Sequence, residues 1–137
     1  MTPEIAQTFL QDNFAPWLLT LKPKVVLISS EETHLRMPIT DNICRVGGVV
    51  TGPALTALAD AAMVLACAGN TGEIAPIATA TLDTQFLRPA SGDSIRAEAE
   101  VTRAGASMVF VNCALIAEPS NKAVALVSAT FSRAALS

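Results

Sequence analysis

A long, nearly uncharged stretch limits what this chain can fold into more than any other feature. Between positions 46 and 72 the only charged residue is Asp60, and alanine recurs throughout the second half of the stretch. Thr51 is a favourable N-cap, and a proline two positions later is tolerated because the N–H groups of a first turn have no helical partner. The pattern predicts a helix over about 51–68 that stops at Gly69-Asn70. Because this helix is apolar nearly all round, we expect it to be buried, with small side chains that let a sheet approach closely.

Short helices and strands are predicted on both sides of this helix. A helix from Pro3 to about Asn13 and an apolar lid or second short turn at 14–19 make residues 1–22 an N-terminal helical segment. Residues 94–103 alternate between apolar and polar side chains, which is typical of a strand with one face in water. The predicted strands are 24–29, 33–38, 75–87, 94–103, 107–117 and 123–133. Because their connections are short, neighbouring strands should be antiparallel. We therefore expect one α+β domain over 1–137, in which a curved antiparallel sheet wraps around one long buried helix.

The composition indicates an oligomer without a nucleic-acid or membrane partner. Charged residues make up 15% of the chain, whereas soluble domains carry about 25%. No run of about 20 apolar residues is present, so burial in a subunit interface explains the low charge better than a membrane span does. The net charge of −3 comes without a basic tract, which argues against nucleic acid. The start of the chain lacks a basic region typical of a secretory signal, and Cys44, Cys67 and Cys113 are expected to be buried, reduced thiols of a cytoplasmic protein.

Asp60 is the main candidate for a functional residue. Aspartate is a poor residue for a helix interior, and burying an unpaired carboxylate costs free energy or raises its pKa. Such a local conflict often marks a functional site. The alternative is structural: Asp60 faces a solvated notch or caps a neighbouring element.

Two segments carry a resemblance to a known family. Gly48-Val49-Val50-Thr51-Gly52-Pro53 precedes Asp60, which comes nine residues after Thr51, and Phe86-Leu87-Arg88-Pro89-Ala90 follows the next predicted strand. Over roughly 33–133 the chain resembles the hot-dog thioesterases of the phenylacetate-pathway type. The resemblance implies a hot-dog fold and an acyl-CoA thioesterase that needs no cofactor and no metal. It also implies a homo-oligomer, as a dimer or a dimer of dimers, in which one predicted strand, 75–87, pairs with its twin.

The resemblance assigns roles to three residues. The backbone N–H of Gly52 would hold the thioester carbonyl, which suits the free N–H groups and partial positive charge of a helix start. Asp60, contributed by the partner subunit, would act as the general base on water or as the nucleophile. Thr79 would hydrogen-bond the water or Asp60, although a threonine that fills a polar slot in a strand is an equally good interpretation.

The chain also departs from the family's pattern. Thr51 stands where the family has histidine, and Pro53 replaces its second glycine, but the Gly52 N–H survives both changes. Arg45 occupies the position of the usual asparagine that orients the carbonyl, and Asn42 lies three residues earlier. Thr51, Arg45 and Asn42 are therefore kept as candidate substrate-binding residues.

The substrate is expected to be a medium-chain or aromatic acyl thioester. Apolar residues would line its pocket, and basic residues would meet the nucleotide phosphates. The candidate lining residues are Met63, Phe86 and the region of Trp17, and the candidate phosphate ligands are Arg88, Arg103 and Lys122.

Two alternatives remain. The first is a non-catalytic module that binds or senses acyl-CoA, which Arg45 in the asparagine position favours. The second is a hot-dog dehydratase or hydratase, which needs a histidine paired with a carboxylate to move protons. His34 is the only histidine and is far from the motif in sequence, so a structural or exposed role is the better interpretation.

Overall fold

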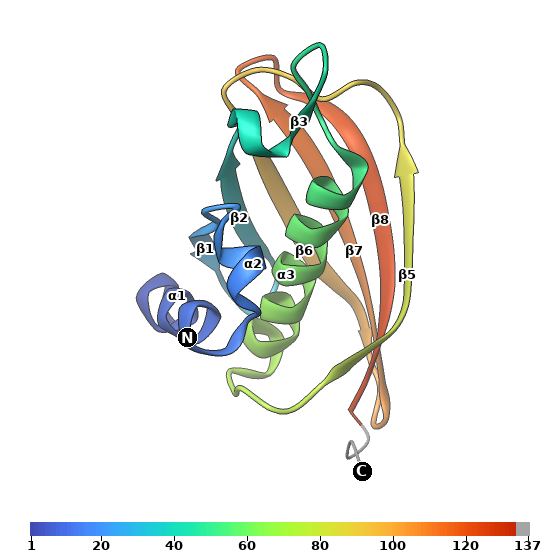
Figure 1. Cartoon of the computed structure of the whole chain (residues 1–137). Helices are drawn as coiled ribbons and strands as arrows, with labels where there is room; N and C mark the ends of the chain where they lie inside the picture. Colours follow the sequence, from blue (N-terminus) through green and yellow to red (C-terminus); the bar gives the residue numbers. More distant parts are fainter. Residues whose placement is uncertain (134–137) are drawn as a thin grey trace.

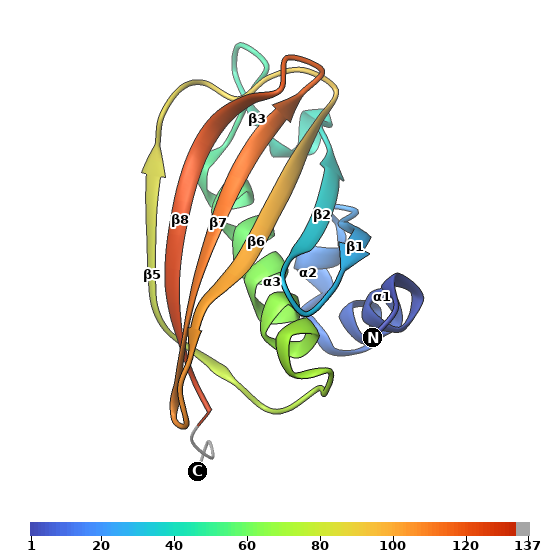
Figure 2. The same cartoon turned by 180° about the vertical axis from the view of Figure 1, so that it is seen from behind.

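The computed structural model describes residues 1–133 as a curved antiparallel sheet with one long helix against its inner face (Figure 1). The order of the six strands is β1-β2-β6-β7-β8-β5, so β1 and β5 are the two edges. Figure 2, from behind, shows the outer face of the sheet, which no helix covers. The fold predicted from the sequence, α+β of the hot-dog type, is confirmed. The strands are β1 (Lys24–Ile28), β2 (Thr33–Pro38), β5 (Ala78–Phe86), β6 (Ser94–Ala104), β7 (Met108–Glu118) and β8 (Lys122–Ser132).

The remaining elements lie before β5 in the chain. The N-terminal segment forms α1 (Pro3–Asn13) and α2 (Pro16–Leu19), as predicted. The region 39–50 contains a 3-10 turn, Asp41–Ile43, and a small hairpin of β3 (Cys44–Arg45) and β4 (Val49–Val50), which the sequence did not predict. The hairpin leads directly into the long helix α3 (Gly52–Thr71).

The helix α3 is the centre of the core. Its mean hydropathy of 1.4 and its 20 residues would suit a membrane span, yet most of it is buried inside the protein. Alternate residues of the strands, such as Leu35, Leu115 and Phe131, have no exposed surface and belong to the same core as α3. The strand β6 shows the predicted alternation, with Ile95 and Ala97 buried and their neighbours on the outer face. The apolar surface of α3 is therefore explained by burial under its own sheet.

The predicted end of the central helix was wrong. The helix continues through Gly69 to Thr71 and is capped by Gly72, whose φ of 78° is the left-handed conformation that glycine adopts readily. Gly69 is there for another reason, because β1 ends against it. A Cβ at position 69 would lie 2.7 Å from the carbonyl oxygen of Ser29 and 2.8 Å from Cγ1 of Ile28. A glycine inside a helix can thus mark close packing rather than a stop.

Gly69→Ala is expected to destabilise the protein. Alanine favours a helix interior over glycine by about 1 kcal/mol, but overpacking against a backbone oxygen costs about 1–3 kcal/mol, and we expect the second effect to prevail. Urea denaturation of Gly69→Ala measures the effect of the close packing at position 69. Gly72→Ala gives, for comparison, the cost of a positive φ alone, because a Cβ at position 72 meets nothing within 4 Å. A Gly69→Ala variant more stable than the wild type would contradict this packing.

The edge strand β5 is shorter and more exposed than the predicted strand 75–87. It begins at Ala78, and most of its side chains are exposed on both faces in the single chain. Its pairing with β8 carries a bulge, since Thr79 lies opposite Phe131 while Thr81 lies opposite Thr130. One face of an edge strand is normally covered, so this exposure sets β5 apart from the other strands.

Of the three cysteines, two are buried as predicted and the third is not. Burial raises the pKa of the Cys67 thiol to about 11 and that of Cys113 to about 12, so both stay protonated at neutral pH. Cys44, in the hairpin, is only half-buried.

Candidate active site

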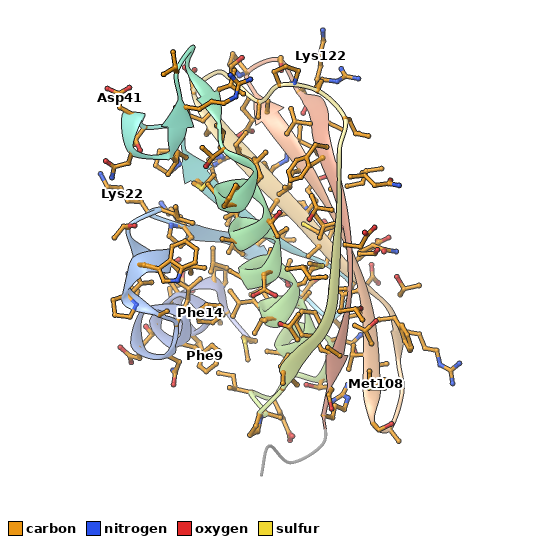
Figure 3. All side chains as sticks on the ribbon, turned by 45° about the vertical axis from the view of Figure 1, so that its right-hand side comes forward. Phe9, Phe14, Lys22, Asp41, Met108 and Lys122 are labelled. Atoms are coloured by element: carbon orange, nitrogen blue, oxygen red, sulfur yellow. The ribbon has the colours of Figure 1, made fainter. Side chains whose placement is uncertain are left out.

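The candidate site lies in the seam between the central helix α3 and β5, the strand at one edge of the sheet (Figures 1 and 3). Asp60, half-buried in the middle of α3, points toward β5. The Thr79 hydroxyl donates a hydrogen bond to Oδ1 of Asp60 over 3.1 Å. The structure thus brings together the carboxylate and the hydroxyl that the sequence analysis singled out.

The surroundings of Asp60 make its carboxyl group a better proton acceptor than an ordinary aspartate. Burial raises the pKa of Asp60, and the hydrogen bond from Thr79 opposes that effect without cancelling it. No lysine, arginine or histidine within residues 1–133 forms an ion pair with this carboxylate. A carboxylate without a cationic partner and with a raised pKa has the properties of a general base.

The start of α3 offers an unoccupied backbone donor. Thr51 is the N-cap in extended conformation, but its side chain makes no capping hydrogen bond. The Thr51 N–H donates to the carbonyl of Ile43, whereas the Gly52 N–H finds no acceptor within residues 1–133. A free N–H at a helix N-terminus, where the helix dipole is positive, suits an oxygen that gains negative charge.

The ring of Phe86 stands against this helix start. A Cβ at position 52 would lie only 3.1 Å from Cζ of Phe86, so glycine is the residue that admits the ring at this distance. Phe86 is itself 56% exposed. The Gly52 N–H is therefore bounded on one side by an aromatic, solvent-accessible wall.

Gly52 and Asp60 of one chain are too far apart to act on the same carbonyl group. They are separated by eight residues of α3, which corresponds to roughly 12 Å along a helix axis. Both lie on the helix face that looks toward β5, since Gly52 approaches Phe86 and Asp60 approaches Thr79. The Gly52 N–H and the Asp60 carboxylate thus mark two separate points along the same seam.

Asn42 and Arg45 lie outside the seam. Both are exposed, and the guanidinium of Arg45 donates to the carbonyl oxygen of Val46 over 3.2 Å at the tip of the hairpin. Arg45 therefore does not contact Asp60 or Gly52.

Two of the three candidate phosphate ligands lie near the start of α3. Arg88 follows β5, and its backbone N–H donates to the carbonyl oxygen of Val124. Val124 is two residues after Lys122, the first residue of β8. Figure 3 shows Lys122 at the end of the molecule where α3 begins and Met108 at the opposite end. Arg103 pairs with Phe110, next to Met108, and is therefore remote from Gly52.

Three further residues are not part of the seam. Met63 has no exposed surface and belongs to the core, whereas Trp17, in α2, is 58% exposed. His34 lies on the outer face of the sheet, where its Nε2 is 2.9 Å from a carboxylate oxygen of Glu32. It lines a cavity of about 610 Å³ on the side of the sheet away from α3. Within residues 1–133 no three His, Cys, Asp or Glu side chains gather where they could hold a metal ion.

One pair of polar residues in the seam was not predicted from the sequence. The hydroxyl oxygens of Thr56 and Thr84 lie 3.1 Å apart, half-buried, between Gly52 and Asp60. Thr56 precedes Asp60 by four residues, the spacing of one helix face, and this signal was present in the sequence. The position of Thr84 had no such signal.

The chain matches a family model and two curated proteins. The model described as "Thioesterase superfamily" matches residues 47–124, more than half of the chain. The protein named "Putative esterase Ta0293" of Thermoplasma acidophilum is 26% identical over 113 residues, which cover 82% of this chain and 83% of that protein. "Putative esterase TV1331" of Thermoplasma volcanium is 27% identical over 108 residues, covering 79% of this chain and 78% of that protein.

Solved structures share the fold at lower identity. The Escherichia coli PaaI protein from the phenylacetic acid degradation operon is 20% identical, with a TM-score of 0.82 over 98% of this chain and 97% of its own. Zebra fish thioesterase superfamily member 2 is 19% identical, with a TM-score of 0.85 over 98% of this chain and 99% of its own. These similarities show the arrangement of helix and sheet.

Proposed function

This chain belongs to the thioesterase superfamily, and we propose that it hydrolyses an acyl-CoA to the free acid and CoA. The observation that carries the proposal is the hydrogen bond of 3.1 Å between Thr79 and Asp60, a half-buried carboxylate in a seam that also holds the free N–H of Gly52. Thioester hydrolysis needs both groups: a proton acceptor for water and a donor for the oxyanion.

The reaction would proceed at the thioester carbonyl. With the carbonyl oxygen on the Gly52 N–H, a water molecule whose proton passes to Asp60 would attack the carbonyl carbon; the carbon–sulfur bond then breaks, and the sulfur leaves and takes up a proton to give the free thiol and the free acid. If the Asp60 carboxylate attacks instead, the same loss of the sulfur leaves an anhydride between the acyl group and Asp60, which water then hydrolyses to the free acid. Thr79 would hold the Asp60 carboxylate in position through its hydrogen bond.

We further propose that the complete site is shared between two copies of the chain. Within one chain, Gly52 and Asp60 are roughly 12 Å apart along α3, and the two edges of the sheet differ. At β1 the side chain of Gln7 bonds to the carbonyl of Pro23 and the N–H of Val25, which blocks that edge. At β5 no other element covers the outer backbone within residues 1–133. A second copy added at β5, as a dimer or within a dimer of dimers, would bring Gly52 of the partner subunit to Asp60.

The exposed wall of the site favours an apolar acyl group. Phe86 is 56% exposed and Leu87 48%, and a large exposed apolar surface beside a polar site is typical of a ligand pocket. Arg88 and Lys122, at the same end as the start of α3, would meet the phosphates of CoA.

A panel of acyl-CoA thioesters tests this proposal. Medium-chain and aromatic acyl-CoAs are expected to be hydrolysed with higher kcat/KM than acetyl-CoA or a short charged acyl-CoA, because the larger apolar group gains burial free energy of about 25 cal/mol per Å² against Phe86. Free CoA released with time is the quantity to measure. A strong preference for acetyl-CoA would contradict the acyl assignment.

The same panel distinguishes a second candidate function, a module that binds acyl-CoA without hydrolysing it. Arg45 favours that function, since the family resemblance implies asparagine at its position and Arg45 lies exposed, away from Asp60. Saturable acyl-CoA binding without CoA release would support this alternative over hydrolysis.

A further inference from the structure

The bulge in β5 decides which of its side chains face α3. In a regular strand Thr79 and Thr84 would point to opposite faces, because they are an odd number of residues apart. The extra residue at the bulge, between Thr79 and Thr81, reverses the alternation. As a result Thr79 lies opposite Phe131 and Thr84 opposite Val127, both of them buried residues on the inner face of β8.

Two side-chain hydrogen bonds join α3 to β5 within residues 1–133. One is the bond from Thr79 to Asp60, and the other is the 3.1 Å contact between the hydroxyls of Thr56 and Thr84. Thr56 and Asp60 lie one helical turn apart on the same face of α3. Within residues 1–133 of the single chain, β8 is the one strand that pairs with the exposed edge strand β5. These two bonds, together with the packing of Phe86 on Gly52, therefore hold β5 close to the helix.

We infer that Thr56 and Thr84 form a positioning pair, which holds β5 against α3 so that the Thr79 hydroxyl stays within hydrogen-bonding distance of Asp60. The inference rests on the proposed role of Asp60 as the base. The hydroxyls of Thr56 and Thr84 contact each other, and the hydrogen bond to Asp60 comes from Thr79. The pair acts through Thr79, and the bulge is what places both threonines of β5 on the helix side.

The effect of the Thr79 hydroxyl on the pKa of Asp60 can be measured because charged groups do not obscure it. Asp83 is the charged residue of β5. It lies opposite Ser128 of β8, and both residues line the cavity on the outer side of the sheet. No ion pair reaches Asp60 from any element within residues 1–133. The Thr79 hydroxyl is therefore the group that lowers the pKa of Asp60, and its withdrawal should raise that pKa further.

Thr84→Val tests the inference, because valine keeps the shape and strand preference of threonine and removes the hydroxyl. We expect kcat to fall about 3- to 10-fold, the loss of one net hydrogen bond, with KM nearly unchanged. The acid limb of the pH–rate profile should move to higher pH. Thr56→Val should give the same changes, and Thr84→Ser should restore the wild-type values. Thr81→Val, on the outer face of the same strand, is the matched control and should leave both quantities unchanged.

A readout without turnover separates this inference from the proposed function. Titration of the Asp60 carboxyl carbon by NMR should show a higher pKa in Thr84→Val than in the wild type, whether or not any thioester is hydrolysed. If the wild type releases no CoA while that shift is present, the proposed function fails and the positioning pair stands. An unchanged Asp60 titration in Thr84→Val overturns the inference. So does an effect of Thr84→Val that is equally large in a Thr79→Val background, since the pair is expected to act only through Thr79.

Discussion

Asp60→Asn is expected to lower kcat by about 10²–10⁴-fold and to leave KM nearly unchanged, because substrate binding rests on other residues. Asparagine keeps the size of the side chain and can still accept the hydrogen bond from Thr79, but it cannot take up a proton or attack a carbonyl carbon. Either role proposed for the carboxylate therefore predicts the loss. Steady-state hydrolysis of the best acyl-CoA of the panel measures it.

The stability of the same variant distinguishes a catalytic from a structural Asp60. Because burial raises the pKa of Asp60 in the folded state, the folded chain binds its proton more tightly than the unfolded chain does. The stability this provides is lost as pH rises from the ordinary carboxyl pKa through the raised one. At neutral pH the ionised carboxylate is thus a cost to folding, and Asp60→Asn should melt at the wild-type temperature or higher. A structural Asp60 predicts the reverse: a lower Tm with normal turnover per folded molecule.

Asp83→Asn is the matched control for this experiment. Asp83 is a carboxylate on β5 that faces the outer side of the sheet, so its replacement changes the net charge equally without touching the seam. It should keep the wild-type kcat and the wild-type pH profile. Equal losses of activity in the two variants would mean that charge, and not the position of Asp60, decides the rate.

The sequence revealed Asp60 because helix periodicity is simple. A lone carboxylate stands out in an apolar helix, and the helix that carries it is long and strongly patterned. The roles of Gly52 and Thr79 were predicted only from the family resemblance. The Thr84 contact was not predicted, because the parity of a strand changes at a bulge, and nothing in the sequence of β5 marks where the extra residue falls.

Glycine was the other source of error, since its sequence signal has two meanings. Gly69 and Gly72 lie three residues apart near the end of α3, and the first was interpreted as the helix stop. Only the position of Ser29, far away in sequence, shows that Gly69 serves close packing instead. The hairpin that places Arg45 away from the seam is likewise fixed by tertiary hydrogen bonds, such as that from the Val50 N–H to the carbonyl of Ala90.

Mixing two inactive variants is expected to restore activity if the site is shared between subunits. Asp60→Asn lacks the base, and Gly52→Pro lacks the N–H that would hold the carbonyl oxygen. Proline suits this position, since it is tolerated at the first residue of a helix and Thr51 already has the extended conformation that a residue before proline prefers. The exposed Phe86 ring, which would meet the new side chain, can turn away into solvent.

In a mixed dimer of these variants, one of the two sites is intact. It combines Asp60 from the Gly52→Pro chain with Gly52 from the Asp60→Asn chain, while the second site carries both defects. Equal amounts refolded together give mixed dimers in half of the molecules, so about a quarter of the wild-type activity should return. Each variant refolded alone is the control and should stay inactive. If Gly52 and Asp60 of one chain served the same site, every site would carry one defect, and the mixture would be as inactive as its components; that result would refute the shared site.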